Sequence, residues 1–101
     1  MPSGDTSHTA LTQAASRVVL IRNQRGLHAR AAAKFVKLAG QFTAEVTVVK
    51  GDMVVTGTSI MGLMMLAAAP GTELELRATG PQAEPVLVAL MELVDRCFDE
   101  D

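Results

Sequence analysis

Strand-like and helix-like sequence meet in the segment Asn23-Gln24-Arg25-Gly26-Leu27-His28-Ala29-Arg30. Gly26 allows the backbone to turn sharply just before the histidine. A side chain at the start of a helix lies among free backbone N–H groups, near the positive end of the helix dipole. Such a place disfavours a cation and favours an anion. His28 is therefore suited to carry a phosphoryl group, and Arg30 is suited to help bind it.

The sequence on either side of this segment predicts a strand followed by a helix. Residues 18–21 are apolar and mostly β-branched, which is typical of a strand. Residues 29–39 place apolar side chains at the spacing of one helix face, namely Ala32, Phe35, Val36 and Ala39. Gly40 is expected to end this helix.

Further along the chain, alternating patterns and turn residues predict three more strands and two more helices. We expect strands over 42–48, 53–56 and 72–79, a hairpin turn at 50–52, and helices over 59–67 and 83–98. The order β-α-β-β-α-β-α predicts an α+β fold. Its economical form is an open-faced two-layer sandwich, in which three helices pack on one face of a four-stranded antiparallel sheet.

Composition excludes several classes of function. The chain has 101 residues, 49% of them hydrophobic, which suits one small domain with a real core. Its net charge of −2 and its aromatic content of 3% argue against nucleic acid as a partner, which would require a basic face or stacking rings. Cys97 is the only cysteine, so disulfides and a cysteine-based zinc site are excluded.

The ends of the chain and its location follow from the same composition. Residues 1–15 are rich in Ser, Thr, Gly and Ala and are expected to form a flexible N-terminal tail, with a domain over residues 16–101. No stretch approaches the roughly 18 apolar residues needed to span a membrane. The N-terminus also lacks the regions of a signal peptide. We therefore expect a cytoplasmic protein without membrane insertion.

The chemistry predicted for His28 is transient phosphoryl transfer. Hydrolysis would require a nucleophile and an acid paired with this histidine, and neither is visible in the sequence. A metal site would require further histidines or clustered carboxylates, and His8 lies in the tail, so no metal site is expected. A guanidinium can bind phosphate oxygens bidentately, which favours Arg30 as a clamp, whereas Arg25 is better explained as an exposed loop charge.

Ser59 is a second candidate site. It directly precedes an apolar run and is predicted to be a helix N-cap, worth roughly 1 kcal/mol. A phosphate on its hydroxyl would be tolerated by the helix dipole and would add a charge of about −2 beside an apolar surface. Such a modification would repel an acidic partner with little change of shape.

The helix after Ser59 is predicted to form a docking surface for partner proteins. It contains more apolar residues than two helical turns can bury, so some of them must remain exposed. Methionine suits a surface that fits several partners. The docking residues we expect are Ile60, Met61, Met64 and Met65, together with Lys37 of the preceding helix.

Two of these segments resemble a known family. Residues 26–30 and 32–36 resemble the active-site segment of HPr, the phosphocarrier of the bacterial phosphotransferase system. Residues 59–64 resemble its regulatory serine segment, and the order of elements agrees over residues 17–98. The resemblance implies the same open-faced sandwich and a carrier rather than an enzyme.

The resemblance also implies roles for individual residues and partners. His28 would accept a phosphoryl group on Nδ1 from enzyme I, which is charged by phosphoenolpyruvate, and would donate it to enzyme II A-type domains. Arg30 matches the active-site arginine of the family. Ser59 matches the serine modified by HPr kinase/phosphorylase in bacteria that have this enzyme. No cofactor is expected, and we expect a monomer.

Some residues depart from the family pattern, and alternatives stay open. Ala31 stands where the family usually has proline, and Thr58 stands where a lysine commonly precedes the serine. The methionine-rich second helix also resembles the nitrogen-related branch, whose carrier is called NPr. A regulatory binding module controlled by phosphate on Ser59 is a further alternative. A small enzyme with His28 as general base lacks a companion residue.

Overall fold

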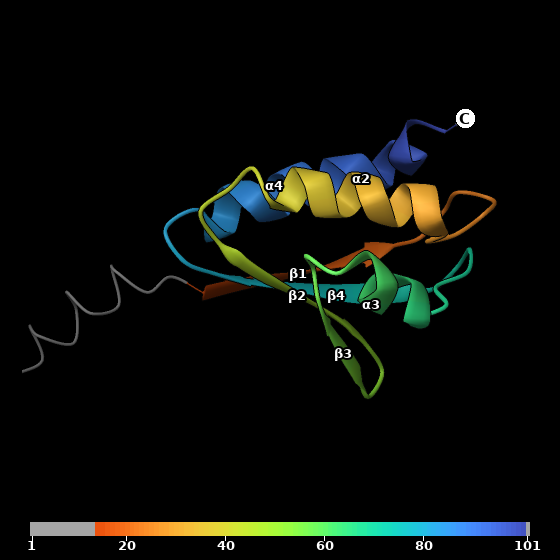
Figure 1. Ribbon diagram of the computed structural model, residues 1–101, viewed down its shortest axis with the longest axis horizontal. Coiled ribbons are helices and arrows are strands. Elements are labelled where there is room, and N and C mark those ends of the chain that lie inside the picture. Colours follow the sequence, from red (N-terminus) through yellow and green to blue (C-terminus); the bar gives the residue numbers. More distant parts are fainter. Residues whose placement is uncertain (1–13, 101) are drawn as a thin grey trace, which may run out of the picture.

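The computed structural model describes residues 14–100 and shows three helices packed on one face of a four-stranded antiparallel sheet (Figure 1). The strand order across the sheet is β1-β4-β2-β3. The strands are β1 (Ala14–Leu20), β2 (Glu45–Lys50), β3 (Met53–Thr56) and β4 (Glu73–Thr79). The helices are α2 (Ala29–Ala39), α3 (Ile60–Met65) and α4 (Ala83–Asp95), followed by the short 3₁₀ turn η1 (Cys97–Asp99). The predicted architecture and element order are confirmed.

The central strand β4 shows how alternation builds the two faces of the sheet. Leu74, Leu76 and Ala78 are buried against the helices, whereas the alternate residues Glu73 and Arg77 are exposed. The register places Leu76 opposite Val48 of β2, which is also fully buried. The period of two in the sequence therefore becomes one apolar and one polar face.

The core lies between this apolar face and the helices. Helix α2 has the predicted bounds and buries Ala31, Ala32, Phe35 and Ala39. Figure 1 shows α2 and α4 lying along each other over the sheet, and α3 packs against α2 and β3. Within the described residues, no helix is both long and apolar enough to cross a membrane.

Some predicted boundaries were wrong, each for a local reason. Strand β1 spans Ala14–Leu20 rather than residues 18–21, because it pairs with β4 from the contact between Ala14 and Thr79 onward. Residues 1–13 of the expected tail lie outside the described residues. Strand β2 begins at Glu45 rather than at residue 42, because the chain turns after α2 through hydrogen bonds from Phe42 N–H to Ala39 O and from Ala44 N–H to Phe42 O.

The last helix ends at Asp95 rather than at Phe98. Cys97, Phe98 and Asp99 all have positive φ, between 55° and 60°, which ends the right-handed helix and forms a left-handed turn. Phe98 is fully buried in this turn, whereas Cys97 is only partly buried. The predicted helix over 83–98 is therefore confirmed up to Asp95, and the left-handed turn after it was not predicted.

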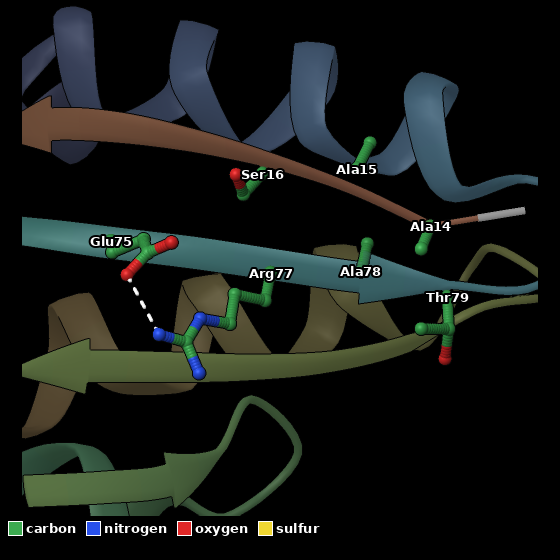
Figure 2. A pocket seen from close by; sticks show the side chains of 7 residues that line it. All are labelled: Ala14, Ala15, Ser16, Glu75, Arg77, Ala78 and Thr79. Atoms are coloured by element: carbon green, nitrogen blue, oxygen red, sulfur yellow. Dashed lines mark hydrogen bonds and ion pairs between the residues drawn. The ribbon is translucent and has the colours of Figure 1, made fainter.

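The face of the sheet that carries no helix remains open. It exposes Val18, Leu20 and Val54, and it carries the ion pair between Arg77 and Glu75, with a nitrogen–oxygen distance of 3.0 Å. Figure 2 shows this pair beside the start of β1, where the paired strands line a shallow pocket. In Figure 1 this end of the sheet lies on the left, whereas the start of α2 lies at the other end of the molecule, on the right.

Replacing Leu76 by alanine should lower the free energy of unfolding by about 2–5 kcal/mol, because it leaves a cavity in the centre of the core. The matched control is Val54→Ala on the open face, where the side chain is 59% exposed, and the expected loss is about 0.5 kcal/mol. Urea unfolding of both variants measures the difference. Equal losses would contradict the assignment of the two faces.

Candidate functional site

His28 lies directly before α2 and caps its N-terminus. Its backbone is extended, and its Nδ1 accepts a hydrogen bond from the backbone N–H of Arg30, with a nitrogen–nitrogen distance of 3.3 Å. The first N–H groups of a helix have no partner within the helix, so the ring satisfies one of them. A nitrogen that accepts a hydrogen bond is unprotonated. The Nδ1 lone pair therefore points at the start of the helix.

The other ring nitrogen of His28 contacts a carboxylate. Nε2 lies within hydrogen-bonding distance of Oε2 of Glu100, and the two side chains are only 16% and 13% exposed. A carboxylate accepts hydrogen bonds and cannot donate when ionised, so Nε2 carries the ring proton. The two contacts together define one tautomer, with the proton on Nε2 and the lone pair on Nδ1.

Asn23 binds the carboxylate of Glu100. Its Nδ2 donates to Oε1 of Glu100 at 3.1 Å and to the carbonyl oxygen of Gly26 at 2.8 Å. Asn23 is 1% exposed, and among the described residues it is the one polar residue that is buried. It ties the loop before His28 to the C-terminal residues.

Gly26 is required by the path of this loop. It has a φ of +63°, and a Cβ built on it would lie 2.3 Å from the carbonyl oxygen of Ala68. The neighbouring Leu27 donates its N–H to the same oxygen at 2.9 Å. Any other residue would be strained and would collide with the segment after α3, so the sharp turn predicted at Gly26 is confirmed.

The C-terminal turn is held in place by contacts with α2 and with itself. Lys34 of α2 donates to the carbonyl oxygen of Phe98 at 2.6 Å. Arg96 donates to Asp99 at 2.9 Å, and this hydrogen bond holds the pKa of Asp99 below its usual range. These contacts hold the turn that brings the carboxylate of Glu100 to Nε2 of His28.

A polar cavity of about 350 Å³ adjoins the histidine. Two of its lining residues, Arg30 and Glu100, also contact His28. Its other walls are Gln24, Arg25 and Asp99. Arg25 is exposed, as predicted for a loop charge, yet it shares this cavity with Arg30.

Ser59 caps α3, as predicted. Its Oγ accepts the N–H of Gly62 at 2.9 Å, and its side chain is partly buried. The helix that follows exposes the predicted apolar residues, namely Ile60 at 41%, Met61 at 72%, Met64 at 45% and Met65 at 66%. Lys37 is exposed on α2, the helix against which α3 packs. Among the described residues, no group of three or more His, Cys, Asp or Glu side chains is placed to hold a metal ion.

Comparisons with known proteins identify the family. A family model described as the PTS HPr component phosphorylation site matches residues 15–96. The chain belongs to the HPr family. HPr from Pseudomonas putida is 49% identical over 86 residues, covering 84% of this chain and 96% of that protein. NPr from Shewanella violacea is 44% identical over 84 residues, covering 83% and 92%.

A solved structure agrees with the family assignment. The crystal structure of HPr-C-His from Thermoanaerobacter tengcongensis superposes with a TM-score of 0.82 at 37% identity, covering 86% of this chain and 98% of that one. The chain is thus a phosphocarrier of the phosphotransferase system rather than a catalyst. The proline usual in this family is absent, and Ala31 stands fully buried in the first turn of α2.

Two residues of the site, Asn23 and Glu100, were not predicted from the sequence. Asn23 and Gly26 form a turn in which the N–H of Gly26 donates to the carbonyl oxygen of Asn23 at 3.1 Å. Asparagine at the first position and glycine at the fourth are a known turn signature, so this contact had a readable signal. Glu100 had none, because its position depends on the left-handed turn at residues 97–99.

Ser59→Ala should lower the free energy of unfolding by about 1 kcal/mol, because the N–H of Gly62 loses its acceptor. Ser59→Asp should keep most of that stability, since aspartate is an equally good N-cap. Thermal and urea unfolding of the two variants test this. A Ser59→Ala protein as stable as the unmodified chain would show that the cap contributes nothing.

Proposed function

We propose that Nδ1 of His28 carries the phosphoryl group that this protein receives from enzyme I and donates to enzyme II A-type domains. The observation that carries the proposal is the capping contact, because it directs an unprotonated ring nitrogen at the start of α2. The N–H groups there and the helix dipole favour an anion.

The chemistry requires little movement. The lone pair of Nδ1 forms a bond to phosphorus as the bond from phosphorus to the donor breaks, and the electron pair of that bond stays with the donor. The hydrogen bond from Arg30 N–H to Nδ1 is lost, and a phosphoryl oxygen can accept that N–H instead. The Arg30 guanidinium, on the wall of the adjoining cavity, can bind two further oxygens.

The exposed apolar face of α3 is the proposed docking surface. Met61 and Met65 are the most exposed of its residues, and a flexible methionine side chain can adapt to several partners. The hydrogen bond from Leu27 to Ala68 links the loop before His28 to the segment that follows α3. A partner that contacts α3 is thereby brought toward the phosphoryl group.

Ser59 is the proposed regulatory phosphorylation site, for HPr kinase/phosphorylase where this enzyme is present. Its hydroxyl is the N-cap of α3 and directly precedes Ile60 and Met61 of the docking face. A phosphate there would stay compatible with the helix and would place negative charge beside the apolar contact. The same carrier chemistry serves sugar transport or nitrogen-related regulation, and the enzyme I that charges His28 distinguishes the two branches.

Replacing His28 by asparagine should abolish labelling by enzyme I and phosphoenolpyruvate, because the nucleophilic nitrogen is lost while asparagine still caps the helix. Arg30→Ala should slow labelling about 10- to 100-fold, whereas Arg77→Ala on the open face should leave it unchanged. Labelling is measured as acid-labile, alkali-stable phosphate. Wild-type labelling of His28→Asn would refute the proposal.

Met61→Ala should weaken binding of enzyme I about 10-fold, equivalent to about 1.4 kcal/mol, because an exposed anchor is removed from the docking face. Ser59→Asp should weaken it as well, through added charge rather than lost contact. The control is Val18→Ala, whose side chain is 62% exposed on the open face of the sheet. Titration calorimetry gives the affinities, and an equal loss for Val18→Ala would argue against α3 as the docking surface.

A further inference from the structure

We propose that Glu100 is a positioning residue for phosphoryl transfer, one that keeps the ring proton of His28 on Nε2 and so leaves Nδ1 free to react. The inference rests on the proposed role of His28 and adds a residue to that site. It follows from the contact between Oε2 of Glu100 and Nε2 of His28.

The contact is built into the fold rather than formed by a free chain end. Both side chains are more than four-fifths buried. The residues before Glu100 are fixed by the burial of Phe98 and by the hydrogen bond from Lys34 to the Phe98 carbonyl oxygen. The N–H of Glu100 also donates to the carbonyl oxygen of Cys97 at 3.1 Å.

Asn23 selects a carboxylate at this position. Its Nδ2 donates to Oε1 of Glu100 and to the carbonyl oxygen of Gly26, so a reversed amide would set Oδ1 against two oxygens. The orientation seen leaves Oδ1 buried without a partner among the described residues. A buried oxygen without a hydrogen-bond partner is destabilising, and the fold tolerates it while Nδ2 points at Glu100.

A negative charge beside Nε2 also matches the charge that develops during transfer. When the neutral ring forms a bond to phosphorus through Nδ1, its proton remains on Nε2 and the ring becomes positively charged. The carboxylate of Glu100 stabilises that charge at short range. When the bond to phosphorus breaks toward the acceptor, the electron pair returns to Nδ1, and the proton has stayed on Nε2 throughout.

The most informative variant is Glu100→Gln. Both carboxylate oxygens of Glu100 make a contact, one with Asn23 and one with His28, whereas glutamine has only one oxygen. Asn23 is buried and commits its Nδ2 to that oxygen, so the glutamine NH₂ must face the ring. An NH₂ donor requires an unprotonated Nε2 and moves the proton to Nδ1, where it blocks the nucleophile. In other proteins, replacing the carboxylate beside a functional histidine by an amide imposes the wrong tautomer in this way and causes a large loss of rate.

The experiment combines nitrogen NMR of the unphosphorylated His28 ring with single-turnover phosphorylation by phosphorylated enzyme I. In the neutral ring we expect the proton on Nε2 in the wild type and on Nδ1 in Glu100→Gln. Glu100→Ala should show an intermediate distribution. Phosphorylation of Glu100→Gln should be slowed at least about 10-fold, in the range found for carboxylates that orient histidine ligands, and Glu100→Ala should be slowed less.

The matched controls are Glu92→Gln and Glu92→Ala, which make the same changes at an exposed residue of α4. They should keep the wild-type tautomer and rate, and unfolding temperatures confirm that all variants fold. Wild-type tautomer and rate in both Glu100 variants would overturn the inference while leaving His28 as the acceptor. If the wild type itself takes no phosphoryl group on His28, the proposed function fails, and the NMR result still reports on the contact.

Discussion

The close approach of the loop before His28 to the carbonyl oxygen of Ala68 is the constraint on which the site depends. It joins the entry of α2 to the exit of α3, and it is possible because residue 26 has no side chain. With the loop held there, the ring of His28 meets the first N–H groups of α2 on one side and Glu100 on the other. The geometry of the histidine therefore depends on three segments far apart in the sequence.

The charges around the polar cavity beside His28 suit a phosphoryl group that is bound only transiently. Arg25 and Arg30 line it together with Asp99 and Glu100, so guanidinium and carboxylate groups occur in equal number. The hydrogen bond from Arg96 lowers the pKa of Asp99. At the proposed site a phosphoryl group would meet attraction from the guanidinium groups and repulsion from the carboxylates, which favours brief retention over tight binding.

Periodicity predicted the fold because each element exposes one face to the core. Leu74, Leu76 and Ala78 alternate in a strand, and Phe35 and Ala39 repeat as in a helix, and all five are buried. His28, Arg30 and Ser59 could be placed for the same reason, since helix starts are local features. Glu100 could not, because it reaches the ring through three consecutive residues with left-handed backbone, none of them glycine. The burial of Phe98 and the hydrogen bond from Lys34 to its carbonyl oxygen are tertiary effects that stabilise this path.

Nδ1 of His28 caps the N-terminus of α2 and is also the atom proposed to carry the phosphoryl group. Before loading, the lone pair of Nδ1 accepts a backbone N–H; after loading, an oxygen of the cargo can accept it. On this proposal the N–H of Arg30 has an acceptor both before and after transfer. The start of α2 therefore loses no hydrogen bond when the phosphoryl group arrives or leaves.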